Sequence, residues 1–304
     1  MNIEPIFGPA DWKLTEKQAA LATQARKLAE KNFAPRASKF DREAAFPTEN
    51  YVDMANAGLL GICIPESEGG LGADLKTYMI AAAEMGRFCG ATALTFNMHV
   101  SSCLWTGFLL DGLDLDADTR KQHNRMRKLH YDRILNEGKI YSQPFSEGGA
   151  AAAGFKAFGT TALKTDGGWI INGKKIFASL SGHADYYGAL CTALQNPDDK
   201  HSRRNTMYLA VPADASGMSV EGEWDPLGMR GTVSRTLIFK DVFVADEAQL
   251  MPLGVYPDAA VRWPHMFMTL TPTYMGIAQA CYDFTVAYLR GCLLYTSPSP
   301  RDRG

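Results

Sequence analysis

The chain changes character between Lys139 and Asp185, and this change most constrains its fold. Helically patterned sequence precedes this stretch, which reads KIYSQPFSEGGAAAAGFKAFGTTALKTDGGWIINGKKIFASLSGHAD. Asp166-Gly167-Gly168 and Asn172-Gly173 predict tight hairpin turns, because Gly and Asn tolerate the positive φ angles that such turns require. A β module between helical segments, with small residues opening a wide pocket at its edge, predicts a site for a large flat ligand.

The bulk properties indicate an ordinary globular protein. The length of 304 residues predicts about two domains with a sizeable core, and the formal net charge of −2 gives no reason to expect nucleic acid or an anionic membrane as partner. The six cysteines lack CxxC or metal-ligand spacing and indicate free thiols in a reducing compartment. The N-terminus does not resemble a signal peptide, and no run of about 18 apolar residues predicts a membrane span. We therefore expect a soluble, cytoplasmic protein without a metal site.

The sequence before the β module predicts helices. Apolar residues at helical spacing indicate a helix over residues 14–40, with Thr15 as N-cap and Pro35 as a stop or kink. In residues 91–103, ATALTFNMHVSSC, small residues beside Phe96 and Met98 favour a buried helix that lines a cavity.

A basic helical face is expected at residues 120–133, RKQHNRMRKLHYDR. We interpret it as solvated helix surface, with phosphate binding as the alternative.

The β module is expected to run from Ile140 to about Val244. Its later strands are predicted in TMYLAVPA, GMSVEGEW and TVSRTLIFKDVFV, which alternate in polarity and are separated by Gly, Asp and Pro. From Trp263 the pattern is helical again. One stripe of this helix carries Met275, Ala278, Tyr282 and Val286.

The last thirteen residues, CLLYTSPSPRDRG, break this helical pattern with Pro298 and Pro300 and have no core character. Their sequence resembles a translation of the adapter used in transposon-based sequencing libraries. We interpret residues 292–304 as adapter-derived, so that the chain up to Gly291 would be a C-terminally truncated protein. The alternative is a short disordered tail.

Four stretches in matching order and spacing make residues 14–291 resemble the acyl-CoA dehydrogenase family. DREAAFPTENYVDMANAGLLGICIPESEGGLG is similar to its N-terminal signature, and KIYSQPFSEGG lies where the family has a Thr-Glu-Pro-Gly type motif. GGWIINGKKIFASLSGHAD resembles INGxKxxITxxxxA, and DPLGMRGTVSRTLIFKDVFV resembles LGxRGSxTxxxxFxDVxVP. The resemblance implies an α+β multidomain fold: an N-terminal helical bundle (1–138), a central β-barrel-like domain (139–250) and the start of a C-terminal helical bundle (251–291).

The resemblance also implies an activity. Family members bind FAD between the β domain and the helices, form homotetramers, and pass electrons to an electron-transferring flavoprotein in fatty acid metabolism. A carboxylate of the C-terminal bundle removes a proton α to an acyl-CoA thioester, while the flavin accepts a hydride. We expect this base beyond Gly291, so we predict no dehydrogenase activity for the fragment. We also predict aggregation through an apolar face from Met275 to Tyr288.

Four residues fall on flavin contacts of the family. Ser146 falls on a hydroxyl that hydrogen-bonds the ring, and Phe145 on the preceding backbone contact. Phe177 falls on an aromatic residue packed on the flavin edge, and Ser179 on a hydrogen-bonding Thr. The alternatives are a turn cap for Ser146 and a core aromatic for Phe177. Glu147 is expected to tether its loop rather than to act as a base.

Departures from the family pattern put a standard CoA thioester substrate in doubt. After Gly149 the sequence AAAAG is shorter than the family loop and lacks the Ser that contacts CoA, which leaves Ala150 as a candidate substrate contact. A family Arg before the Gly-x-Ala motif has only Arg262, further back, as a counterpart, and Gly148 replaces the motif Pro. His99 is a second candidate substrate contact, with a core histidine as the alternative.

Three functional hypotheses follow. The leading one is an FAD-dependent oxidoreductase that dehydrogenates the CH–CH group of an acyl thioester. A flavin-dependent monooxygenase or hydroxylase of the same fold, acting on a non-CoA substrate, needs no catalytic carboxylate and is the alternative. A non-catalytic binding module is disfavoured because hydroxyls are kept at Ser146 and Ser179.

Overall fold

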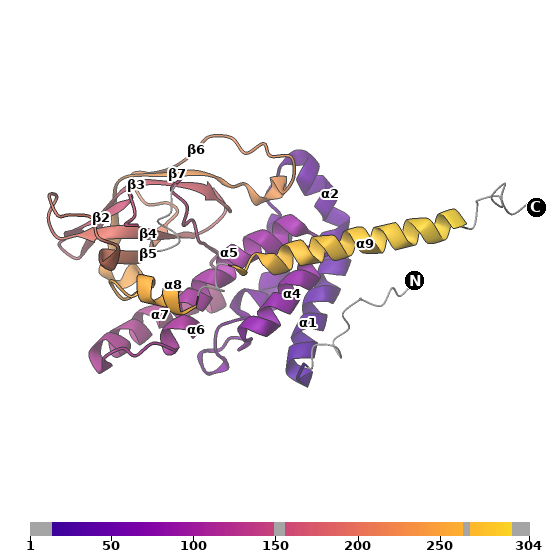
Figure 1. Cartoon of the computed structure of the whole chain (residues 1–304), viewed down its shortest axis with the longest axis horizontal. Coiled ribbons are helices and arrows are strands. Elements are labelled where there is room, and N and C mark those ends of the chain that lie inside the picture. Colours follow the sequence, from indigo (N-terminus) through magenta and orange to yellow (C-terminus); the bar gives the residue numbers. More distant parts are fainter. Residues whose placement is uncertain (1–13, 149–155, 264–267, 294–304) are drawn as a thin grey trace, which may run out of the picture.

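The computed structural model describes residues 14–148, 156–263 and 268–293 (Figure 1). A helical domain, a β-sheet domain and a long C-terminal helix follow one another along the chain, which confirms the predicted order of elements. Ala150 and residues 294–304 of the adapter-like tail lie outside the described residues.

The N-terminal helix α1 (Glu16–Leu28) begins as predicted at Thr15. The Thr15 hydroxyl accepts from Gln18 N, and the Gln18 side chain accepts in turn from Thr15 N. A π-helical turn (Ala29–Phe33) joins α1 to α2 (Ala34–Glu43). Pro35 stands in the first turn of α2, where its missing N–H is tolerated, so the proline does not stop the helical path.

The remaining helices of this domain are α3 (Thr48–Asn56), α4 (Leu75–Gly86), α5 (Gly90–Thr106), α6 (Phe108–Asp111) and α7 (Ala117–Glu137). Helix α5 is buried along most of its length, as its small residues predicted. The basic segment lies on α7, where Lys121, Arg125 and Lys128 are exposed, which supports the interpretation as helix surface.

In the described residues of the β domain, the strands form one mixed sheet of eight strands. The strands are β1 (Tyr141–Ser142), β2 (Thr161–Thr165), β3 (Gly168–Ala178), β4 (Tyr186–Leu194), β5 (Thr206–Pro212), β6 (Met218–Glu221), β7 (Arg235–Ala245) and β8 (Gln249–Met251). Their order is β6-β7-β3-β2-β4-β5-β8, and β1 pairs in parallel with β4. The turn at Asp166-Gly167 joins β2 to β3 as predicted, because Thr165 faces Gly168 across it.

The predicted turn at Asn172-Gly173 is wrong. Both residues lie inside β3, at a bulge in its pairing with β7, and Gly173 has φ +142°. A Cβ on Gly173 would lie 2.7 Å from Thr160 Cα, and the Asn172 side chain bonds Asp241 on β7. The same residue types that favour a turn here permit a bulge and a close approach of neighbouring strands.

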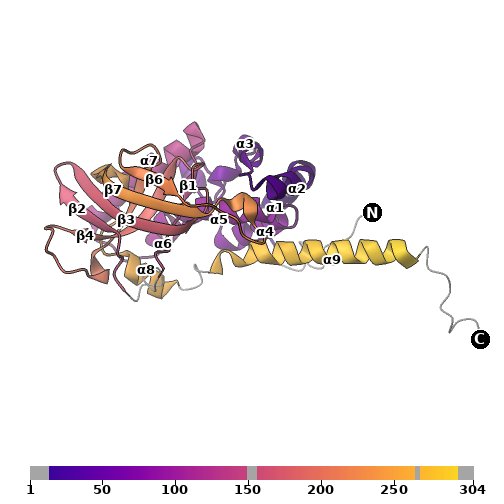
Figure 2. The same cartoon turned by 90° about the horizontal axis from the view of Figure 1, so that it is seen from above.

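After the short helix α8 (Tyr256–Arg262), helix α9 (Thr271–Leu293) runs along α4 and extends past the helical domain (Figure 2). Thr273 and Gly276 are buried against the domain, whereas the predicted stripe with Met275 and Tyr282 is largely exposed. Within the described ranges, no helix has both the length and the apolar character needed to cross a membrane.

Candidate functional site

A cavity of about 450 Å³ lies between α5, the β domain and the start of α9. Helix α5 lines it with Leu94, Asn97, Met98, Ser101 and Trp105, as expected for a cavity-lining helix. The start of α9 and the residues before it contribute Thr269, Leu270 and Tyr274. None of the described residues that line the cavity has a charged side chain, so the wall consists of aromatic, aliphatic and neutral polar groups.

All four residues predicted to contact a flavin line this one cavity: Phe145, Ser146, Phe177 and Ser179. They come from two separate segments, the stretch after β1 and the end of β3. The folded chain therefore places them together, and their ligand stays a prediction.

Phe177 reaches the cavity because β3 is bulged. The pairing of β3 with β7 shifts register between Lys175 and Ala178, and Phe177 takes the left-handed φ of 52°. For a bulky non-glycine residue this conformation costs about 1 kcal/mol or more. The bulge leaves the ring 65% exposed, edge-on to Trp224 with ring centroids 6.2 Å apart. The alternative of an ordinary core aromatic at Phe177 is therefore wrong.

Ser179 is one end of a chain of three buried hydroxyls. Its Oγ lies 2.8 Å from Ser234 Oγ, which lies 2.8 Å from Thr232 Oγ1. Thr232 Oγ1 donates to the Met229 carbonyl at 2.9 Å. Because each hydroxyl has one proton, this last bond makes Ser234 donate to Thr232 and Ser179 donate to Ser234, which leaves Ser179 a lone pair for a ligand. A ligand acceptor can be served only if the chain reverses and the bond to Met229 is lost.

The loop after β1 is fixed by main-chain and side-chain bonds. The Ser146 carbonyl accepts from Ile176 N at 2.8 Å, which joins the loop to β3. Glu147 accepts from Gly159 N at 2.7 Å and from Lys175 Nζ at 2.6 Å, so its expected role as a tether is confirmed. Ser146 itself is exposed and lines the cavity.

His99 does not contact the cavity, and the prediction of a substrate contact there is corrected. The residue is fully buried; Nε2 donates to the Leu60 carbonyl at 2.9 Å, and Nδ1 accepts from Tyr141 N at 3.0 Å. Burial lowers the pKa of His99 to about 4. Both ring nitrogens thus serve the backbone, which is the alternative of a core histidine. Ala150, the other candidate, lies outside the described residues.

Gln143 and Trp224 are among the lining residues that sequence reasoning missed. Gln143 is 8% exposed, and among the described residues its Oε1 has no hydrogen-bond partner. A buried carbonyl without a partner is unfavourable unless a ligand donates to it. Gln143 could have been predicted, because it is a polar residue in the same short stretch after β1 that carries the predicted contacts Phe145 and Ser146.

Comparison with known proteins identifies the family. Residues 15–111 match the acyl-CoA dehydrogenase N-terminal domain, and residues 145–242 match the acyl-CoA dehydrogenase middle domain. The probable acyl-CoA dehydrogenase YngJ of Bacillus subtilis is 26% identical over 292 residues, covering 92% of this chain and 70% of the relative. The mitochondrial short-chain specific acyl-CoA dehydrogenase of Mus musculus is 28% identical over 304 residues, with coverages of 96% and 70%.

Solved structures share the fold. FMN-bound TdsC from Paenibacillus sp. A11-2 superposes with a TM-score of 0.75 at 25% identity, covering 89% of this chain and 65% of that one. Butyryl-CoA dehydrogenase from Megasphaera elsdenii gives a TM-score of 0.70 at 22% identity, with coverages of 94% and 70%. The chain thus spans about two thirds of the length of the proteins it matches. Both matched domains and the relatives agree that this chain belongs to the acyl-CoA dehydrogenase family.

Proposed function

We propose that the chain binds FAD in the cavity between α5 and β3 and serves an oxidoreductase of acyl-CoA dehydrogenase type. The observation that carries this proposal is the convergence of Phe145, Ser146, Phe177 and Ser179 on one uncharged cavity. The expected reaction is the α,β-dehydrogenation of an acyl thioester. We further propose that the complete protein is a homotetramer and passes its electrons to an electron-transferring flavoprotein.

The residues present fit a flat, polar-edged ring. Phe177 and Trp224 provide aromatic surface in the cavity wall, and Ser179 and the Gln143 carbonyl, which has no partner among the described residues, provide polar groups. Bound flavin would supply the hydride acceptor. The protein's part is to hold the ring between rigid elements and to stabilise the charge it gains with oriented neutral dipoles.

The proton must be removed by a group that the described cavity wall does not carry. We propose a carboxylate beyond Gly291 for this role. The described lining residues would then bind and orient the substrate, with α5 excluding water through Leu94, Met98 and Trp105.

A flavin-dependent monooxygenase is the second candidate. The dibenzothiophene monooxygenase TdsC has the same fold, with a TM-score of 0.74 at 23% identity. The cavity of this chain also suits an uncharged aromatic substrate, since Trp105, Phe145 and Tyr274 line it. Oxygen consumption by the reduced, FAD-loaded protein with an aromatic substrate, without turnover of acyl-CoA, would favour this candidate.

FAD binding is tested directly by titrating the purified chain with FAD and following quenching of flavin fluorescence. We expect saturable binding that weakens about three- to tenfold in Phe177→Ala, because a ring contact contributes about 0.5–1.5 kcal/mol. Phe243→Ala on β7 is the matched control, because that ring is 50% exposed and does not line the cavity. Absence of any FAD binding by the unaltered chain would overturn the proposal.

A second prediction concerns the direction of the hydroxyl chain. Thr232→Val removes the hydroxyl that commits Ser179 to donate to Ser234, and Ser234 to donate to Thr232. Ser179 is then free to donate to a ligand acceptor, which stabilises the charge that the flavin gains on reduction, so we expect a higher midpoint potential of the bound flavin than in the unaltered protein. Ser181→Ala is the control, because that buried hydroxyl donates to Ala178 O and lies off the chain. An unchanged midpoint potential in Thr232→Val would contradict the assigned direction.

A further inference from the structure

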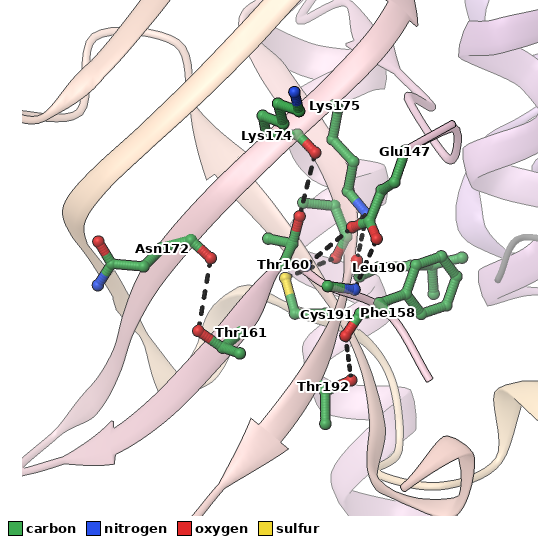
Figure 3. A network of polar contacts seen from close by, with 12 residues as sticks. Glu147, Phe158, Thr160, Thr161, Asn172, Lys174, Lys175, Leu190, Cys191 and Thr192 are labelled. Carbon is green, nitrogen blue, oxygen red and sulfur yellow. Dashed lines mark hydrogen bonds and ion pairs between the residues drawn. The ribbon is translucent and has the colours of Figure 1, made fainter. Parts of the chain in front are cut away.

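A buried ion pair lies behind the cavity wall. Lys175 is fully buried on β3; its Nζ bonds Glu147 Oε1 at 2.6 Å and the Leu190 carbonyl at 2.5 Å. The Phe158 ring covers the ammonium group, with Nζ 4.5 Å from the ring centroid. In Figure 3 the two charged side chains point toward each other from the loop and from β3.

Stability alone gives no reason for this pair. Removing two charges from water costs several kcal/mol, and apolar residues of similar volume often replace a buried ion pair without loss of stability. Burial acts to raise the pKa of Glu147, but the Lys175 charge and N–H donors hold it below its usual value, so the carboxylate is ionised.

The pair joins the two segments that form the cavity wall. Glu147 directly follows Ser146, and Lys175 stands where the bulge that presents Phe177 begins. The backbone hydrogen bond from Ile176 N to the Ser146 carbonyl joins the same two segments next to the ion pair. Glu147 also accepts from Gly159 N and Thr160 N at 2.7 and 3.1 Å, which fixes the chain where it re-enters the sheet.

A strained bulge needs such an anchor. The left-handed Phe177 is unfavourable by itself and persists only where its surroundings fix the backbone on both sides. After the bulge, Leu180 N and Ser181 N donate to the carbonyls of Thr232 and Val233. Before it, β3 pairs with β7 as far as Lys175, and the Lys175 side chain and the Ile176 amide add attachments to residues 147 and 146.

We propose that Glu147 and Lys175 are positioning residues: their buried ion pair holds the Ser146 loop against the β3 bulge, so that the cavity wall is formed before a ligand binds. As far as the ligand is FAD, this inference rests on the proposed function. The ion pair itself is a property of the chain without ligand, so it can be tested separately.

The test compares global stability with local opening. Glu147→Gln and Lys175→Met each leave one buried group without its partner, and both are expected to lower the midpoint of thermal unfolding. The double variant Glu147→Leu/Lys175→Met removes both charges and keeps apolar volume, so its midpoint is expected to return close to that of the unaltered protein. Hydrogen exchange of the Ile176 amide should nevertheless stay at least about tenfold faster in the double variant, because its acceptor loop is no longer tethered.

Lys164→Met/Asp246→Leu is the matched control. This ion pair, at 2.9 Å, lies in the same domain between β2 and the end of β7, and its side chains are 33% and 44% exposed. It should leave exchange at Ile176 unchanged. If the double variant at residues 147 and 175 regains both its midpoint and slow exchange at Ile176, the pair is a packing feature and the proposal is overturned.

FAD titration of the same variants separates the two proposals. If the cavity binds FAD, the Glu147→Leu/Lys175→Met variant is expected to bind it at least about tenfold more weakly than the Lys164→Met/Asp246→Leu control. If the double variant shows fast exchange at Ile176 while the unaltered chain binds no FAD, the positioning role is supported and the proposed function is overturned. If the double variant does not fold, Glu147→Asp replaces it, because this variant keeps the charge on a shorter side chain. Exchange of the Ile176 amide is measured in the same way. Unchanged exchange in Glu147→Asp would count against the proposal.

Discussion

Lowering the pH from 7.5 to 5 is expected to destabilise the fold by several kcal/mol, because three histidines are buried in their neutral form. Burial lowers the pKa of His99 and of His123 to about 4 each, and that of His130 to about 3. An unfolded histidine titrates near 6.5, so the unfolded chain takes up protons that the native fold excludes. The linkage relation gives about 2 kcal/mol for each histidine at pH 5.

The hydrogen bonds of His99 explain why protonation is unfavourable. Tyr141 N donates to Nδ1, so a proton on Nδ1 would face another N–H. His130 is similar, since Nε2 lies 3.2 Å from the Gln249 carbonyl and Nδ1 lies 2.9 Å from the Tyr141 hydroxyl. The sign follows from the lowered pKa values. The contribution of these histidines to the free energy of unfolding is fully present above about pH 6.5 and decreases as the pH falls toward 4. Below the folded-state pKa values it changes no further.

Urea unfolding at pH 7.5, 6 and 5 measures this slope. His99→Gln is the informative variant, because an amide can accept from Tyr141 N and donate to the Leu60 carbonyl without taking up a proton. We expect it to lose less stability than the unaltered protein between pH 7.5 and 5, by about 2 kcal/mol. His201→Gln, in an exposed loop, is the control and should keep the full slope. Equal slopes for the chain with and without His99 would contradict the prediction.

The sequence predicted the order of helical and β segments because hydrophobic periodicity and turn residues are local signals. It also identified the residues that meet at the cavity, because their motifs lie on two short stretches with recognisable patterns. It failed at Asn172-Gly173, where local turn preference was overridden by β7, a strand about seventy positions later that pairs across the bulge. Local propensity cannot report a partner that arrives from so far along the chain.

The same limit explains the charged pair behind the cavity wall. Nothing in GWIINGKKIFA separates Lys174, which is exposed, from Lys175, which is fully buried. The distinction arises because Glu147 and Leu190 approach Lys175 from other elements. His99 shows the reverse error: a histidine near a cavity-lining pattern was weighed as a ligand contact, but its bonds lead to the backbone of two other segments.

Gly276→Ala is expected to displace α9 from α4 and to lower the free energy of unfolding by about 3 kcal/mol, the upper range for an overpacked contact. A Cβ on Gly276 would lie 2.1 Å from the Ala83 carbonyl oxygen and 2.7 Å from Arg87 N. On the facing helix, a Cβ on Gly86 would lie 2.6 Å from the Thr273 carbonyl oxygen. These neighbours are backbone atoms, so no side chain can turn aside and the helices must separate.

Displacement of α9 should also change the cavity, because Tyr274 in its first turn and Thr269 and Leu270 just before it line the cavity. We therefore expect weaker FAD binding together with faster hydrogen exchange along α9. Gly291→Ala is the matched control on the same helix: its Cβ would meet no atom of the described chain within 4 Å, and alanine favours helix, so stability should not fall. Unchanged unfolding free energy and exchange in Gly276→Ala would show that the helices do not cross at these glycines in solution.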